Sequence, residues 1–154
     1  MRKYGVPVVI ILLIALDQLV KWWTVENIAL DTVRDFIPQV MSLAYVRNYG
    51  AAWSLLQNQQ TFFAIMTVIV MSGAIWYLIK HLQGSIWMVA GLCLVIAGGL
   101  GNFIDRVRLG YVVDMFHLDF INFPVFNVAD SYLTVGVLVL FVWMMKEEDN
   151  GVNN

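Results

Sequence analysis

The 154 residues are 60% hydrophobic and 13% charged, with a mean hydropathy of +0.75, a composition that excludes an ordinary soluble domain and indicates a membrane protein. The net charge of −2 provides no basic surface to neutralise phosphates, which argues against nucleic acid as a partner. A single cysteine, Cys93, rules out an internal disulfide and a cysteine-rich metal site. Because Cys93 lies in the middle of an apolar segment, we interpret it as a small structural residue.

The chain begins with an apolar segment, residues 5–23, that we interpret as a first membrane-spanning helix. Arg2 and Lys3 precede it, as in a secretory signal peptide, but no small-residue cleavage site follows, so we expect the segment to be retained. Asp17 and Lys21 lie four residues apart and can pair on one helix face. From the pair alone we expect an ion pair where the helix end reaches the membrane interface; an orienting role near a site is the alternative.

The first long connection, residues 24–60, has the character of short strands. Residues 33–37 and 40–46 mix β-branched and apolar side chains, which favours strands over a helix. The simplest interpretation of Asn48 is an Asx turn. Residues 51–57 are predicted to form one or two helical turns at the membrane surface.

Three further segments are long enough to cross a hydrocarbon core of about 30 Å. They are residues 61–79, 85–104 and 125–145, the last interrupted only by Asn127 and Asp130. The glycines along the second of these segments are expected to allow close helix packing in lipid.

We therefore predict one integral-membrane domain, residues 1–154, with four spans and two outer loops, residues 24–60 and 105–124. Four spans place both termini on the same side of the membrane. The basic residues are almost evenly divided between the two sides, but the positive-inside rule gives the first helix special weight, so we place the termini in the cytoplasm.

Polar side chains gather where the third span ends and the fourth begins. Asn102, Asp105 and Arg106 are spaced to share one helix face, and Asn127 and Asp130 are three residues apart. Because these two spans meet the same membrane face there, both groups are expected at one end of the bundle. A charge near the bilayer centre costs about 2.5–3.5 kcal/mol, so such residues are functional candidates.

Asp114 lies between these groups, in a strand-like apolar run, residues 111–116, where the charged form of a carboxyl is disfavoured. If Asp114 and Asp130 converge, they share one proton, and one acts as a base for water while the other acts as an acid for the leaving group. The residues alone leave an alternative open: Asp114 caps a turn and Asp130 pairs with Arg106.

Other chemistries find less support in the sequence. Ser131, His117 and Asp114 contain the ingredients of a serine triad, but no nucleophile elbow surrounds the serine. A metal site is not predicted, because there are only two histidines and His81 belongs to the opposite membrane face. A non-enzymatic alternative is a small four-helix, proton-coupled carrier with Asp130 as relay, although the second and third spans carry no charge at mid-membrane.

Five short motifs follow one another along the chain. They are Asp17-Gln18-x-x-Lys21, Arg47-Asn48-x-Gly50-Ala51-Ala52-Trp53-Ser54, Gly101-Asn102-x-x-Asp105-Arg106, Val112-Val113-Asp114 and Phe126-Asn127-x-Ala129-Asp130-Ser131. In content and order they resemble the motifs of the lipoprotein signal peptidase (signal peptidase II) family. The resemblance extends from the first helix to the last.

The resemblance implies an all-α membrane protein of four transmembrane helices, with a small extracytoplasmic β-structured cradle and a short interfacial helix. It implies an intramembrane aspartic endopeptidase, with Asp114 and Asp130 as the catalytic pair. Such an enzyme removes the signal peptide from bacterial prolipoproteins, just before a cysteine that carries diacylglycerol. Its partners would be lipidated prolipoproteins and membrane lipid, without metal or organic cofactor, in the bacterial cytoplasmic membrane with the active site near the outer face. The residues implied to bind substrate or support the site are Asn48, Gly50, Trp53, Asn102, Arg106, Asn127, Asp17 and Lys21.

Overall fold

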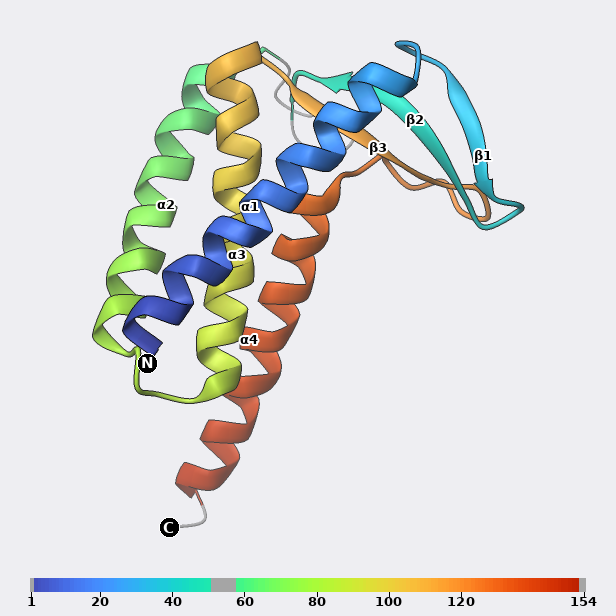
Figure 1. Cartoon of the computed structure of the whole chain (residues 1–154). Helices are drawn as coiled ribbons and strands as arrows, with labels where there is room; N and C mark the ends of the chain where they lie inside the picture. The colour runs from blue at the N-terminus through green and yellow to red at the C-terminus, as the bar shows by residue number, and fades with distance from the viewer. Residues whose placement is uncertain (1, 51–57, 153–154) are drawn as a thin grey trace.

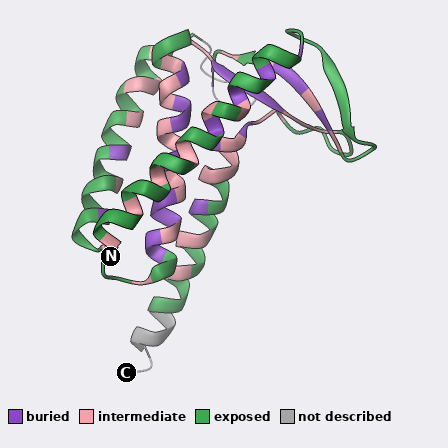
Figure 2. Cartoon of the chain, in the orientation of Figure 1, coloured by how far each residue is buried: buried purple, intermediate pink, exposed green. Residues whose placement is uncertain are grey.

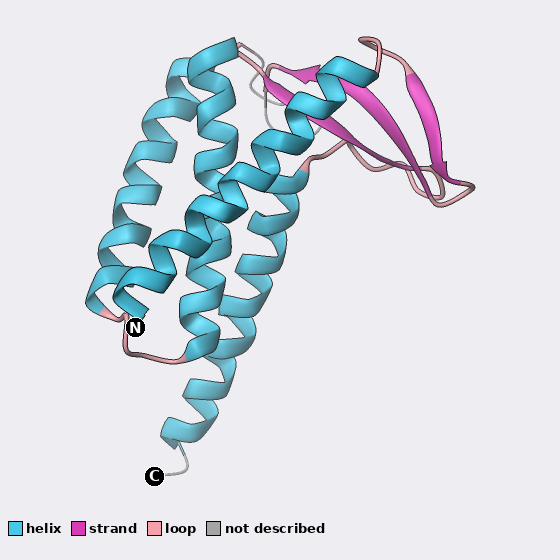
Figure 3. Ribbon diagram, in the orientation of Figure 1, coloured by secondary structure: helices cyan, strands magenta, loops and turns pink. Residues whose placement is uncertain are grey.

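The computed structural model describes residues 2–50 and 58–152, with side chains described as far as residue 147. The elements are α1 (Arg2–Asn27), β1 (Val33–Ile37), β2 (Met41–Asn48), α2 (Gln60–Lys80), α3 (Ile86–Leu109), β3 (Val112–Leu118) and α4 (Val128–Val152). The long helices form a bundle, and the small sheet lies at one end of it (Figures 1 and 3). Each helix is long and apolar enough to span a membrane, which confirms the predicted fold class. The predicted interfacial helix, residues 51–57, lies outside the described residues.

Helix α3 is the centre of the bundle and packs against the other three helices. Figure 2 shows that the buried residues of the bundle lie mainly along α3. Helices α1, α2 and α4 have exposed faces, and the residues on these faces are largely apolar, as in lipid-facing helices. A Cβ added at Gly98 would lie 2.8 Å from Leu133 Cγ, and one at Gly91 would lie 2.8 Å from Leu140 Cγ. These glycines therefore let α4 approach α3 closely, as predicted. Cys93 is buried in the same core, which confirms its structural interpretation.

Both ends of the described chain lie at the end of the bundle opposite the sheet, together with the turn between α2 and α3 (Figure 1). Arg2 ties α1 to that turn, because its Nη1 donates to the carbonyl oxygen of Gly84 at 2.7 Å. This arrangement agrees with an even number of spans and termini on one side.

The sheet is antiparallel, with the strand order β1-β2-β3. In the register of β2 and β3, Val46 faces Asp114 and Asn48 faces Val112, after an irregularity that follows Leu43. The two predicted strands are confirmed, and the second continues to Asn48, two residues beyond its predicted end. This extension matters because it places Asn48 inside the sheet beside β3.

The two faces of β3 have different roles, because successive side chains of a strand alternate. One face packs against the C-terminal end of α1 in a buried cluster of Ile28, Tyr45, Val113 and Met115. On the other face, Val112 and Asp114 line a groove that opens towards α3 and α4. The sheet thus carries Asp114 to the helix bundle.

The helices differ in extent from the predicted spans, and two of the differences involve residues of the polar cluster. The third span was expected to end at residue 104 but continues to Leu109, where Gly110 adopts a left-handed φ of 78° and ends the helix. The fourth was expected to begin at residue 125 but begins at Val128. The cause is a reciprocal cap: Asn127 Oδ1 accepts from the N–H of Asp130 at 2.9 Å, and Asp130 Oδ2 accepts from the N–H of Asn127 at 3.2 Å.

Candidate active site

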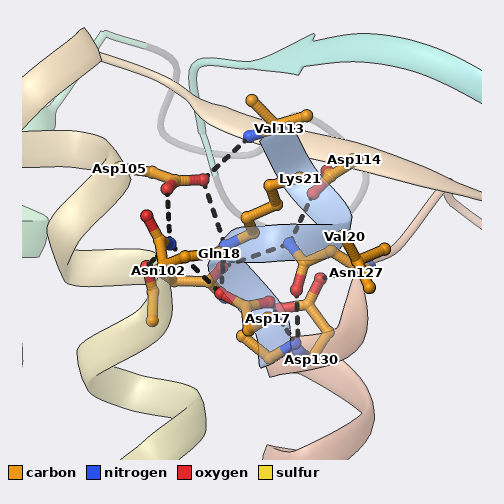
Figure 4. Close-up of polar contacts among 12 residues, drawn as sticks. Asp17, Gln18, Val20, Lys21, Asn102, Asp105, Val113, Asp114, Asn127 and Asp130 are labelled. Atoms are coloured by element: carbon orange, nitrogen blue, oxygen red, sulfur yellow. Dashed lines mark hydrogen bonds and ion pairs between the residues drawn. The ribbon is translucent and has the colours of Figure 1, made fainter. Parts of the chain in front are cut away.

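Asp114 on β3 and Asp130 in the first turn of α4 line one groove of about 630 Å³. Figure 4 shows their side chains among polar groups from α1, α3 and the start of α4. The groove wall nearer the sheet is apolar and includes Val112, Leu118 and Phe126. Two carboxyl groups therefore share one cavity, as the aspartyl interpretation requires.

The Asp114 carboxyl is 2% exposed and accepts one hydrogen bond on each oxygen. Asn48 Nδ2 donates to Oδ2 at 2.9 Å, and Asn127 Nδ2 donates to Oδ1 at 2.6 Å. Asn48 Oδ1 also accepts from the N–H of Gly50 at 2.9 Å. The predicted Asx turn is thus confirmed, and it fixes which end of the Asn48 amide faces Asp114.

Asp130 is held in the same way from two directions. Asn102 Nδ2 donates to its Oδ1 at 2.7 Å, and the N–H of Asn127 donates to its Oδ2 at 3.2 Å. The Oδ1 of Asn102 accepts from Lys21 Nζ at 2.9 Å and from Asn127 Nδ2 at 3.1 Å. Both asparagine amides are therefore oriented by partners on each end.

Burial raises the pKa of Asp114 from its ordinary value of 3.8 to about 7. The negative charge of Asp130 is the second cause of this increase, while the hydrogen bonds from Asn48 and Asn127 and the charge of Lys21 oppose it. Asp114 therefore titrates near neutral pH instead of being fully ionised there, and it interacts electrostatically with Asp130.

Asp17 and Lys21 form their predicted ion pair, 3.0 Å from Nζ to Oδ2, and the pair is buried inside the protein near the groove, as the alternative of an orienting role requires. Asp17 is 0% and Lys21 is 3% exposed. They are buried because α1 crosses α3 here: a Cβ on Gly101 would lie 2.6 Å from Asp17 Oδ2. Lys21 also lies 3.0 Å from Asp105 Oδ2, so the pair belongs to a buried cluster beneath the groove.

Arg106 lines the groove but does not pair with Asp130 as the alternative interpretation required. Among the described residues no ion pair joins Arg106 to a carboxylate; its Nη2 donates to the carbonyl oxygen of Gly50 at 3.2 Å. Its guanidinium lies over Phe63, 4.8 Å from the ring centroid. Trp53 lies outside the described residues.

The serine triad is not assembled. His117 Nδ1 lies 3.1 Å from Asp119 Oδ1 on the sheet, and Ser131 Oγ donates to the carbonyl oxygen of Asn127 at 3.1 Å. His117 therefore contacts Asp119 instead of Asp114, and Ser131 donates to a backbone carbonyl instead of to His117.

Gln18 and Asp105 are not among the residues that the resemblance implies to bind substrate or support the site. Gln18 Nε2 donates to Asp105 Oδ1 at 2.9 Å and to Asp17 Oδ2 at 3.2 Å, so it closes the buried cluster. Gln18 stands in the same motif as Lys21, and Asp105 shares a helix face with Asn102. These two positions are the sequence features that could have identified Gln18 and Asp105 as site residues.

Comparisons with known proteins give one consistent result. A family model described as signal peptidase (SPase) II matches residues 9–146. The chain is 60% identical over 154 residues to a lipoprotein signal peptidase of Streptococcus agalactiae serotype V, covering 100% of both chains. It is 64% identical over 150 residues to the lipoprotein signal peptidase of Streptococcus pneumoniae, covering 97% of this chain and 98% of that one. A solved bacterial membrane enzyme superposes with a TM-score of 0.90 at 34% identity, covering 95% of this chain and 90% of the other.

Proposed function

This chain belongs to the signal peptidase II family and removes signal peptides from lipoprotein precursors in the membrane; we propose that it does so as an aspartic endopeptidase with Asp114 and Asp130 as the catalytic pair. The observation that carries the proposal is the shared groove, in which the charge of Asp130 contributes to raising the pKa of Asp114 to about 7. The comparisons give no support to the alternative of a proton-coupled carrier.

The two carboxyl groups have different tasks in this proposal. Asp114 carries the shared proton at neutral pH and is the general acid. Asp130, whose two oxygens accept from Asn102 and from the N–H of Asn127, is the ionised general base. Because the two like charges in one groove repel each other and Asp114 is buried, a single proton shared between the two carboxyl groups is the stable arrangement.

The hydrolysis returns the pair to its starting state. Asp130 takes a proton from water as the water oxygen attacks the scissile carbonyl carbon, and Asp114 gives its proton to the carbonyl oxygen. When the carbon–nitrogen bond breaks, the leaving nitrogen takes the proton from Asp130. Asp114 then recovers a proton from a hydroxyl of the tetrahedral intermediate as the new carboxyl group forms.

The shape of the groove suits an extended peptide that is attached to lipid. Beyond the two aspartates the groove continues along Thr67 of α2, Gly99 of α3 and Val135 of α4, which places its lower part among membrane-spanning helices. We assign this part to the acyl chains of the diacylglyceryl group. Each methylene buried in lipid contributes about 0.8 kcal/mol of anchoring, so two chains confine the scissile bond to the plane of the site.

The proposed catalytic pair is tested with purified protein in nanodiscs and a diacylglyceryl-modified precursor peptide. Asp114→Asn and Asp130→Asn preserve shape but remove the acid–base cycle, so each should lower kcat by roughly 10²–10⁴-fold or more. Near-wild-type turnover in either variant would refute the assignment of that residue. Asp119→Asn is the matched control, because this exposed carboxylate contacts Ser42 and His117 on the sheet instead.

The proposed substrate is tested with the same peptide lacking its lipid. We expect cleavage of the unlipidated peptide to be severely reduced, because it loses its confinement at the groove. Equal kcat/KM for the two peptides in the same nanodiscs would show that the enzyme does not recognise the lipid.

A further inference from the structure

The Lys21 ammonium group is the point where three buried acceptors meet. It lies 3.0 Å from Asp17 Oδ2, 3.0 Å from Asp105 Oδ2 and 2.9 Å from Asn102 Oδ1. An ammonium group has three hydrogens, so these three partners use its full donor capacity. Figure 4 shows Lys21 reaching from α1 into the space between α3 and the catalytic residues.

Each of these acceptors leads on to one of the two catalytic segments. Asp105 Oδ2 accepts from the N–H of Val113, the residue before Asp114, at 3.1 Å. Asp17 Oδ1 accepts from the N–H of Ala129, the residue before the other catalytic aspartate, at 2.9 Å. One lysine thus connects, through two carboxylates, the strand that carries one aspartate and the helix start that carries the other.

The third acceptor controls a side-chain contact of the catalytic pair. Because Asn102 Oδ1 accepts from Lys21 and from Asn127, its Nδ2 must point to Asp130, to which it donates at 2.7 Å. A reversed Asn102 amide would place its NH₂ group against the Lys21 ammonium and its oxygen against a carboxylate. Lys21 therefore determines the direction of this hydrogen bond.

On the basis of the aspartic mechanism proposed above, we propose that Lys21 is a positioning residue that sets the spacing and orientation of Asp114 and Asp130. Lys21 does not itself line the groove, and among the described residues its hydrogen bonds and ion pairs go to Asp17, Asp105 and Asn102 and not to the catalytic carboxyl groups. It therefore acts through these three residues, of which Asn102 lines the groove. Misplacement of catalytic groups by about 1 Å can cost on the order of 100-fold in rate. Loss of this link should therefore lower kcat strongly while leaving the thermal midpoint nearly unchanged.

The test requires a variant that removes the link without leaving buried charges. Lys21→Met alone would strand two buried carboxylates and is expected to unfold the protein. We therefore combine it with Asp17→Asn and Asp105→Asn, which keep an oxygen for the N–H groups of Ala129 and Val113. The triple variant should keep the thermal midpoint and KM close to wild type, while kcat falls by about 100-fold.

A second variant covers the case in which the triple variant does not fold. Lys21→Arg keeps the positive charge, but a planar guanidinium cannot donate hydrogen bonds to three acceptors from a single nitrogen, as the ammonium group does. It should fold and lose about tenfold or more in kcat with KM preserved. Lys80→Met is the matched control, since Lys80 lies in the last turn of α2 over Trp76, far from the catalytic end, and should leave every measurement unchanged.

A pair of inhibitors separates positioning from general support of the fold. A peptide analogue with a hydroxyl at the scissile position should bind wild-type enzyme far more tightly than its deoxy counterpart, because both aspartates must contact the hydroxyl. In the Lys21 variants the affinity for the deoxy analogue should persist, while the preference for the hydroxyl falls towards one. Wild-type kcat and hydroxyl preference in the variants would overturn the role of Lys21. A preference near one in the wild type would instead overturn the aspartic mechanism itself.

Discussion

With one side chain, Asn127 caps a helix and contacts Asp114, one of the two proposed catalytic groups. Its Oδ1 caps α4 by accepting from the N–H of Asp130, and its Nδ2 donates to Asp114 at 2.6 Å. Because the backbone N–H fixes the oxygen, the amide cannot reverse without losing the cap, which is typically worth about 1 kcal/mol. The orientation of the Asp114 carboxyl is therefore tied to the first turn of α4.

At the same scale, the titration of Asp114 predicts how activity depends on pH. Burial and the charge of Asp130 raise its pKa to about 7, and the proposed catalytic pair needs one proton for the reaction. Cleavage should therefore decline as the pH rises through about 7, by roughly tenfold per unit at the limit. The pH profile of kcat/KM, which reports the free enzyme, checks this, and a constant kcat/KM up to about pH 9 would contradict it.

The same titration affects stability with a defined sign. The raised pKa means that the folded protein holds a proton that the unfolded chain has already released above its ordinary value of 3.8. This stabilisation is fully present below about pH 4 and is lost as the pH rises through about 7. Asp114→Asn cannot titrate, so its thermal midpoint should lack this part of the pH dependence.

At the scale of elements, the sequence predicted helices and strands better than it predicted their ends. Four long apolar segments and three short strand-like runs predicted helices and strands, and each corresponds to an element of the structure. The charged residues after residue 104 suggested a loop, whereas the helix continues until Gly110 permits a left-handed turn.

The spacing of Asp17 and Lys21 predicted their ion pair but not its burial, because burial depends on how α1 crosses α3. Spacing alone likewise could not bring Asp114 to Asp130; the sheet register does that.

That crossing of α1 over α3 depends on Gly101. In Gly101→Ala the new Cβ would lie 2.6 Å from Asp17 Oδ2 and 3.2 Å from Ala129 Cβ, so one of these groups must move. We expect a loss of about 1–3 kcal/mol in the free energy of unfolding, together with most of the activity. Gly73→Ala on α2 is the control, because nothing lies within 4 Å of its added Cβ. Thermal unfolding and cleavage rates of both variants check the prediction, and an unaffected Gly101→Ala would exclude a tight crossing.

At the scale of the whole molecule, the two ends of the bundle should face different compartments. We expect the termini and the turn after α2 to be cytoplasmic, and the sheet with the catalytic groove to lie at the outer face. On a Cys93→Ser background, Asp31→Cys and Asp119→Cys should react with an impermeant thiol reagent added outside, and His81→Cys should react only after permeabilisation. The reverse pattern would place the active site at the inner face.

The central position of α3 also has a consequence for biosynthesis. Helices α1 and α2 are synthesised first, yet the helix against which both pack comes third in the chain. Until α3 has been inserted, the Lys21 side chain has neither Asp105 nor Asn102 to contact, and Asp130 arrives only with the last helix. A nascent chain arrested before α4 therefore holds only one residue of the proposed catalytic pair, Asp114. On the proposed mechanism, a chain that ends before α4 should be unable to cleave its substrate.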